Sequence, residues 1–140
     1  METSRPFAII TGASSGIGLE LAREAAERGY DVLIAADRPL DEQAAELRTY
    51  GATVVAVECD LATREGVEML YQHAGNRRVD ALLANAGHGL GKGFLDQEFA
   101  EVQHVINTNI TGTLDLIQRV APPLQPSDTP KRRSRSRMRS

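Results

Sequence analysis

The sequence predicts an α/β fold: a doubly wound parallel sheet with helices on both faces. Short apolar runs alternate along the chain with segments whose apolar residues recur at helical spacing. The apolar runs do not alternate with polar residues, which is typical of strands covered on both faces. Repetition of strand and helix in this way favours right-handed crossovers and therefore parallel strands. The 140 residues are enough for one domain with a hydrophobic core.

Each predicted element has its own local signal. The expected strands are the apolar runs Phe7–Ile10, Asp31–Ala36, Thr53–Val57 and Val79–Ala84. The helices between them are expected to end at or near glycines, namely Gly29, Gly51 and Gly75. Thr63 is placed to cap the third helix. A longer helix is predicted from about Gln97 to Val120, because one apolar stripe runs along it: Phe99, Val102, Ile106, Ile110, Leu114 and Ile117.

The stretch "TGASSGIG", Thr11–Gly18, occupies the turn between the first strand and the first helix. Glycines in this position allow a tight turn, close approach of a pyrophosphate to the main chain and close packing of the helix. The helix N-terminus offers free N–H groups and a positive dipole end to phosphates, and Ser14 and Ser15 add hydroxyl donors. Turns also use glycine for steric reasons alone, but the strand–turn–helix context favours phosphate binding.

Asp37 ends the second strand, 19 residues after Gly18. A carboxylate at this point can accept hydrogen bonds from both hydroxyls of an NAD ribose and would repel a 2′-phosphate. The neighbouring Arg38 favours that phosphate, and Asp37 could also serve only to start a turn before Pro39. On balance the pair favours NAD over NADP.

Four motifs, in order and at suitable spacing, resemble the short-chain dehydrogenase/reductase family. They are the glycine motif Thr11-Gly12-x-x-x-Gly16-x-Gly18, Asp60-Leu61 after the third strand, Asn85-Ala86-Gly87 after the fourth, and Asn109 on the following helix. The resemblance covers about Phe7 to Ala121, the first half of the family's domain. It implies a Rossmann-type sheet that binds NAD or NADP and transfers hydride between the nicotinamide and an alcohol or carbonyl substrate.

The resemblance also assigns roles to residues. Asp60 and Leu61 would lie against the adenine, and Asn109 would shape its helix and hold a water in a proton relay. From the residues alone, Asp60 could be a turn former, Asn85 could be structural, and Asn109 could simply bond to a neighbour. The full set of expected cofactor-binding residues is Gly12, Ser14, Ser15, Gly16, Ile17, Gly18, Asp37, Arg38, Asp60, Leu61, Asn85, Ala86 and Gly87, with Asn109 as the expected catalytic residue. No spacing of His, Cys, Asp or Glu suggests a metal site.

Three histidine and lysine residues near the expected site carry no motif of their own. His88 and Lys92 fall in a glycine-rich loop and are expected to be solvated, although either could touch substrate. His104 falls on the polar face of the long helix and is expected to be exposed. Cys59, the only cysteine, is expected to be a reduced thiol buried in a strand.

The family's catalytic serine and Tyr-x-x-x-Lys pair have no counterpart in this sequence. The residues four positions after Tyr30, Tyr50 and Tyr71 are Ile34, Val54 and Gly75. After Asn109, serine occurs only from Ser127 onward. We therefore expect a sheet truncated after about four strands, with an open apolar edge at "VDALLA", and no turnover by this chain alone.

The predicted domain covers residues 1–121, and residues 122–140 are predicted to be a disordered tail rich in Pro, Ser and Arg. The last ten residues hold six bases and no acid, whereas the first 130 hold 10 bases and 19 acids. Such an abrupt shift suggests a change of reading frame near Pro122. A genuine arginine-rich tail that contacts RNA, DNA or an acidic partner is the rival interpretation.

Composition limits the remaining possibilities. The acidic body argues against broad nucleic-acid binding by the domain itself. No signal peptide and no apolar run of membrane-spanning length is found, so a cytoplasmic protein without a membrane partner is expected. The expected partners are a dinucleotide cofactor and a small alcohol or ketone substrate, with oligomeric state left open. A non-catalytic NAD(H)-binding protein and an interaction protein acting through the basic tail remain alternatives.

Overall fold

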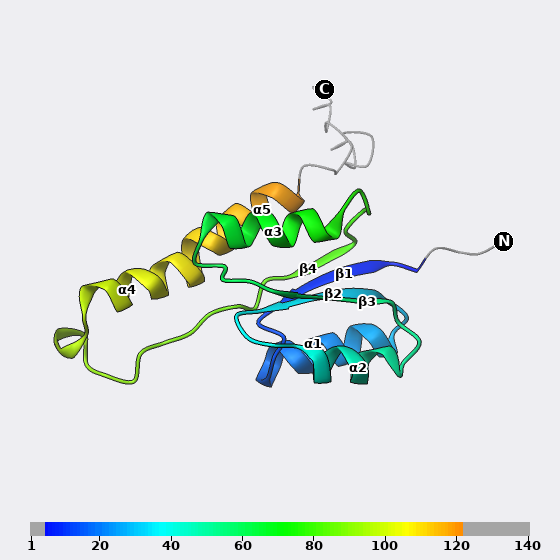
Figure 1. Cartoon of the computed structure of the whole chain (residues 1–140), viewed down its shortest axis with the longest axis horizontal. Coiled ribbons are helices and arrows are strands. Elements are labelled where there is room, and N and C mark those ends of the chain that lie inside the picture. Colours follow the sequence, from blue (N-terminus) through cyan, green and yellow to red (C-terminus); the bar gives the residue numbers. More distant parts are fainter. Residues whose placement is uncertain (1–4, 122–140) are drawn as a thin grey trace, which may run out of the picture.

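A four-stranded parallel sheet forms the centre of the computed structural model, which describes residues 5–121 (Figure 1). The strands are β1 (Phe7–Thr11), β2 (Asp31–Ala36), β3 (Val54–Glu58) and β4 (Ala81–Leu83). Their order across the sheet is β3-β2-β1-β4. The chain therefore moves outward from β1 to β3 and then returns to the other side of β1 for β4. This reversal places a topological switch point between β1 and β4.

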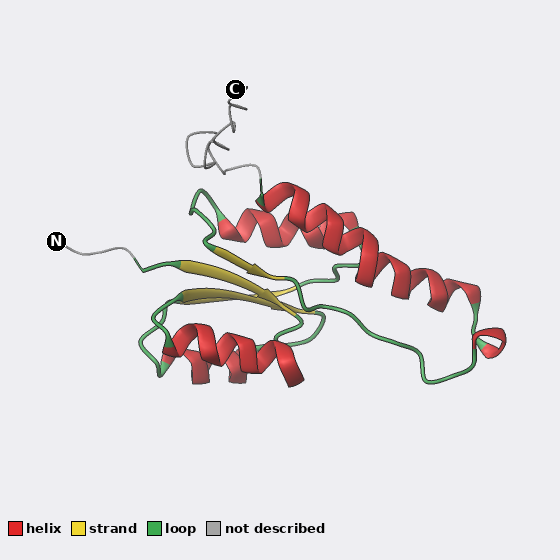
Figure 2. Ribbon diagram, turned by 180° about the vertical axis from the view of Figure 1, so that it is seen from behind, coloured by secondary structure: helices red, strands yellow, loops and turns green. Residues whose placement is uncertain are grey.

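Helices cover both faces of the sheet, as the apolar strands predicted. Helices α1 (Gly16–Glu27) and α2 (Asp41–Arg48) lie on one face (Figures 1 and 2). Helices α3 (Arg64–Ala74), α4 (Phe99–Ile106) and α5 (Thr113–Val120) lie on the other face. The predicted doubly wound, Rossmann-type fold is confirmed.

The side chains on the two faces of the strands pack into two separate hydrophobic cores. Ile10, Val32 and Ile34 pack toward α1 and α2, whereas Ile9 and Leu33 point the other way, toward α3 and α5. All five side chains are inaccessible to solvent. Because successive residues of a strand point to opposite faces, a strand buried on both sides must be apolar at every position.

The helix caps follow the local signals closely. The Thr63 hydroxyl accepts a hydrogen bond from the Gly66 N–H at 3.0 Å, as expected for an N-cap. Gly75 ends α3 with a φ of 62°, a backbone conformation that glycine adopts without strain. The strand β4, by contrast, is shorter than the predicted Val79–Ala84 and pairs only through three residues with β1.

The predicted long helix is divided into parts. A short 3₁₀ turn (η1, Phe94–Asp96) precedes α4, and a π-helical segment (η2, Asn107–Gly112) joins α4 to α5. Gly112 lies so close to the loop after β3 that a Cβ there would overlap the carbonyl oxygen of Leu61. The wider π turn falls where the helix meets this loop, and the uniform helical period predicted no such irregularity.

The apolar stripe of this long helix is mostly exposed. Five of its residues are accessible to solvent, namely Phe99, Ile106, Ile110, Leu114 and Ile117. The buried anchor of α5 is instead Leu116, which is 1% exposed and packs with Ile9 and Leu33. Helix α4 extends beyond the carboxyl ends of the strands and has no buried residue (Figure 1).

The tail predicted to be disordered, 122–140, lies outside the described residues. Within residues 5–121, no helix has the length and apolar character needed to cross a membrane.

Candidate functional site

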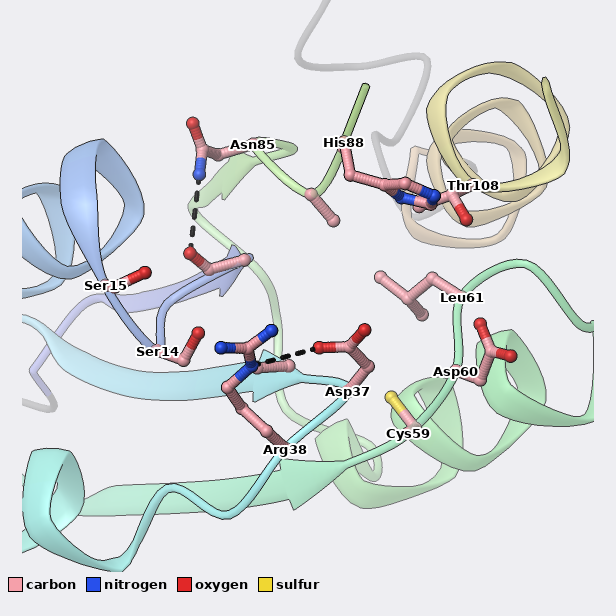
Figure 3. Close-up of a pocket in the computed structure, with 14 residues that line it drawn as sticks. Ser14, Ser15, Asp37, Arg38, Cys59, Asp60, Leu61, Asn85, His88 and Thr108 are labelled. Atoms are coloured by element: carbon pink, nitrogen blue, oxygen red, sulfur yellow. Dashed lines mark hydrogen bonds and ion pairs between the residues drawn. The ribbon is translucent and has the colours of Figure 1, made fainter. Parts of the chain in front are cut away.

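A cleft opens at the carboxyl ends of the strands, beside the switch point between β1 and β4 (Figure 3). Ligands of open α/β sheets bind in this position. The cleft is formed by the loops that follow all four strands together with the π-helical segment. Its lining residues are Gly12, Ser14, Ser15, Ala36, Asp37, Arg38, Cys59, Asp60, Leu61, Asn85, Ala86, Gly87, His88 and Thr108.

The glycine turn after β1 has the geometry that its sequence predicted. Gly12 and Gly16 have φ values of 67° and 57°, which are strained for residues with a Cβ. A Cβ on Gly18 would overlap the carbonyl oxygen of Gly12, so the first turn of α1 packs directly on the glycine turn. The N-terminus of α1 is uncapped by any side chain, because Ser15 makes no capping hydrogen bond. Its free N–H groups can therefore serve an anion.

The loop after β4 is fastened to the end of β1. The buried Thr11 hydroxyl accepts hydrogen bonds from the backbone N–H groups of Asn85 and Ala86, at 3.0 and 2.9 Å. The Asn85 amide donates in turn to the Gly12 carbonyl at 3.5 Å. These contacts hold the two loops on either side of the switch point in one arrangement. In the sequence, Thr11 stands out only as part of the glycine motif, because its bridging role depends on the pairing of β1 with β4.

Asp37 and Arg38 form the rim of the cleft at the end of β2. The Arg38 Nε lies 3.5 Å from the Asp37 Oδ1, and both side chains are about two-thirds exposed, at 66% and 67%. Such an exposed pair is weak, so a ligand hydroxyl can compete for the carboxylate.

The loop after β3 forms a third wall. The Asp60 carboxylate accepts a hydrogen bond from the Ala62 N–H at 2.9 Å, so it does stabilise a turn while also lining the cleft. Cys59 lies just beyond the end of β3 and is buried, close to its expected place in a strand. Burial raises the pKa of its thiol to about 11, and the neighbouring Asp60 charge adds to the shift. The thiol is therefore neutral and unreactive at neutral pH.

Asn109 does not line the cleft. Its Oδ1 accepts from the His88 N–H at 2.9 Å, and its Nδ2 donates to the His88 carbonyl at 3.0 Å. The side-chain amide is thus occupied by the backbone of the β4 loop. In this arrangement Asn109 positions the loop, and its amide keeps one further N–H and one further lone pair beyond the two bonds to His88.

The structure brings ten of the thirteen expected cofactor-binding residues to the cleft. The other three, Gly16, Ile17 and Gly18, form the first turn of α1, where the Ile17 side chain is 73% exposed. Sequence reasoning missed Ala36, Cys59 and Thr108 as lining residues and assigned His88 to solvent. Ala36 and Cys59 are neighbours of predicted site residues at the ends of strands, so the sequence could have indicated that they line the cleft. No sequence feature indicates Thr108, because its place in the cleft depends on the path of the long helix.

A glycine turn at an uncapped helix N-terminus, an acidic residue at the end of β2 and a cleft at the switch point are the features with which doubly wound α/β folds bind dinucleotides. The family model described as short chain dehydrogenase matches residues 6–133. The chain belongs to the short-chain dehydrogenase family.

Several relatives illustrate this membership. A very-long-chain 3-oxoacyl-CoA reductase from Scheffersomyces stipitis is 32% identical over 83% of this chain and 36% of its own length. An uncharacterized oxidoreductase from Myxococcus xanthus is 37% identical over 86% of this chain and 49% of its own length. The chain thus spans only about half or less of the length of these curated relatives.

Solved structures show the same relationship. L-sorbose reductase from Gluconobacter frateurii, complexed with NADPH and L-sorbose, superposes with a TM-score of 0.79 at 30% identity. The match covers 85% of this chain and 47% of that one. A 3-oxoacyl-[acyl-carrier protein] reductase from Brucella melitensis in complex with NAD has a TM-score of 0.79 at 28% identity, covering 93% of this chain and 53% of that one.

Proposed function

We propose that this chain binds a nicotinamide dinucleotide in the cleft and prefers NAD to NADP. The observation that carries the proposal is the combination of the glycine turn, the uncapped N-terminus of α1 and Asp37 around one cleft. The pyrophosphate would lie on the N–H groups of the turn and helix, beside Ser14 and Ser15. The adenosine ribose would meet Asp37, and the adenine would lie toward Asp60 and Leu61.

The preference for NAD follows from the charges at the end of β2. The Asp37 carboxylate can accept hydrogen bonds from both ribose hydroxyls, and it would repel the 2′-phosphate of NADP. Arg38 opposes this preference, because its exposed guanidinium pairs only weakly with Asp37 and could also meet a 2′-phosphate. Similar proteins have been solved with either NADPH or NAD, so the family alone does not decide the question.

The relatives' names point to hydride transfer between the cofactor and a carbonyl or alcohol substrate, and we propose this as the reaction of the lineage. A carbonyl reduction also needs an acid near the substrate oxygen. None of the chain's three tyrosines lines the cleft. Tyr30 and Tyr50 lie in the turns before β2 and β3, at the opposite end of the sheet, and Tyr71 lies on the outer part of α3. We therefore propose that this chain holds the cofactor but completes no turnover by itself.

A fluorescence titration of the 140-residue chain with NADH and NADPH tests the binding. We expect NADH to bind about tenfold more tightly than NADPH, a difference of about 1.4 kcal/mol. Ser14→Asp places a negative charge beside the expected phosphates and should weaken NADH binding at least about tenfold. Gln72→Asp makes the same charge change at an exposed position of α3, away from the cleft, and should leave binding unchanged. Failure of the unmodified chain to bind NADH would overturn the proposal.

The preference and the absence of turnover have separate tests. Replacing Asp37 by Ser removes the repulsion but keeps Arg38, so the gap between NADH and NADPH should close. An unchanged gap would exclude Asp37 as its cause. NADH oxidation with 3-oxoacyl thioesters or L-sorbose should show no activity above the background, and a rate that scales with protein concentration would refute the inactive assignment.

A further inference from the structure

His88 is held more firmly than a solvated loop residue needs to be. Its backbone N–H and carbonyl both bond to the Asn109 amide, at 2.9 and 3.0 Å. Its ring lies against the ring of His104 on α4, with the centroids 5.0 Å apart and the planes tilted by 44°. Two bonds to its backbone and one contact with its ring, all from the segment α4–η2, therefore hold a residue that the sequence placed in a glycine-rich loop.

The fixed ring lines the nucleotide cleft. In Figure 3, His88 and Thr108 lie on one side of the cleft, and Asp37 and Arg38 lie on the opposite side. A side chain that is ordered before a ligand arrives loses little conformational entropy on contact with it. The attachment of His88 thus prepares an imidazole surface, with one donor and one acceptor nitrogen when neutral, for whatever occupies this part of the cleft.

The topology of the sheet indicates which part of a dinucleotide that is. With the pyrophosphate on the glycine turn after β1, the adenosine half extends over β2 and β3, where Asp37 and Asp60 lie. The other half must then extend past the switch point, over the carboxyl end of β4. The loop that carries His88 follows β4 directly.

Resting on the proposed function, we propose that the His88 ring contacts the nicotinamide half of the bound dinucleotide and that His104 is a positioning residue for that ring. The nicotinamide half carries two kinds of polar group that can form a hydrogen bond with an imidazole nitrogen. They are the ribose hydroxyls and the carboxamide. The adenosine half would lie mainly over β2 and β3, so the contact proposed for His88 is with the half on the β4 side of the cleft.

Binding of NADH and of 5′-AMP to the full chain separates the two halves of the ligand. His88→Ala should weaken NADH binding about tenfold and leave AMP binding unchanged. Unchanged AMP binding also shows that the variant is folded. His73→Ala is the matched control, because His73 is an exposed histidine on α3 whose ring, among residues 5–121, bonds only to the Met69 carbonyl, at 2.8 Å. This control should change neither affinity.

The positioning role has its own variants. His104→Ala removes the ring beneath His88 and should weaken NADH binding about threefold, again without effect on AMP. His104→Phe keeps an aromatic ring in that place and should restore most of the loss. A loss that Phe does not restore would overturn the positioning role.

Three results would overturn the contact itself. Unchanged NADH binding by His88→Ala would show that the ring touches nothing that matters for binding. Equal losses for NADH and AMP would show that His88 only shapes the cleft. Absence of NADH binding by the unmodified chain would overturn the proposed function, and this inference with it.

Discussion

The strand β2 is apolar after Asp31 and the helix α5 is amphipathic, as their sequences predict. Their apolar side chains nevertheless differ greatly in exposure to solvent. Leu33 and Ile34 of β2 are inaccessible to solvent, because the strand has β1 and β3 as neighbours and helices above and below. Leu114 of α5 is 62% exposed, and Ile110, one turn earlier in η2, is 53% exposed. The unbroken apolar run of β2 therefore predicted its cover correctly, whereas the apolar stripe of the long helix identified a helix but not how much of that stripe would be covered.

The difference comes from what surrounds each element. Among the described residues, β2 lies inside the sheet between β1 and β3. Helix α5 instead packs beside α3 and joins the core through Leu116. An apolar stripe gains stability only when a second surface removes it from water.

The largest expected effect tests the comparison directly. Leu33→Ala removes a fully buried side chain between close neighbours and should lower the free energy of unfolding by about 4 kcal/mol. Leu114→Ala makes the same chemical change on the exposed stripe and should cost less than about 0.5 kcal/mol. Chemical denaturation of both variants measures these values. Equal costs would show that α5 is covered in solution and would break the comparison.

A second prediction concerns the contact by which the exposed helices attach to the sheet. A Cβ on Gly112 would overlap the Leu61 carbonyl oxygen, so Gly112→Ala should force the backbones apart and cost about 3 kcal/mol. Gly91→Ala is the control, because no atom lies within 4 Å of the added Cβ. Thermal unfolding should separate the two variants. If Gly112→Ala were as stable as Gly91→Ala, the helices would not depend on this close approach.

A third prediction concerns Asp31, at the start of β2 in the well-packed region. Its carboxylate accepts from the Thr53 N–H at 2.9 Å and from the Arg77 guanidinium at 2.8 Å, with Arg5 also 3.1 Å away. Burial raises the pKa of Asp31, but these partners lower it by more, so the folded pKa lies below the ordinary value of 3.8. The carboxylate therefore stabilises the fold above that ordinary value, and its contribution is lost as the pH falls through the folded pKa.

Replacing Asp31 by Asn should consequently cost about 2 kcal/mol at pH 7, because the ion pairs are lost while an acceptor for Thr53 can remain. The stability difference between the two proteins should shrink below about pH 4, as the unmodified chain loses its own carboxylate charge. Denaturation at a series of pH values measures the difference. A constant difference from pH 7 down to pH 2 would mean that the charge of Asp31 is not what matters.

The site residues that could be predicted from the sequence are those whose signals lie within one short segment of the chain. The turn from Gly12 to Gly18 was readable because its glycines, the preceding strand and the following helix lie within one short segment. Asp37 was readable because a strand end can be located by its apolar run. Thr108 could not be predicted, because it reaches the cleft only through the path of the long helix. For His88 the sequence left contact with solvent and contact with a ligand both open.

The sequence by itself determined the strands, the glycine turn, the cap at Thr63 and the parallel, doubly wound arrangement. These depend on backbone conformation and on short-range alternation of apolar residues, which neighbours in the chain already specify. Only the tertiary structure decided that Leu116 and not Leu114 is buried, that Asn109 holds the backbone of His88, and that a π-helical turn falls where Gly112 meets Leu61. Those outcomes depend on which distant segments of the chain meet, and no short-range pattern specifies that.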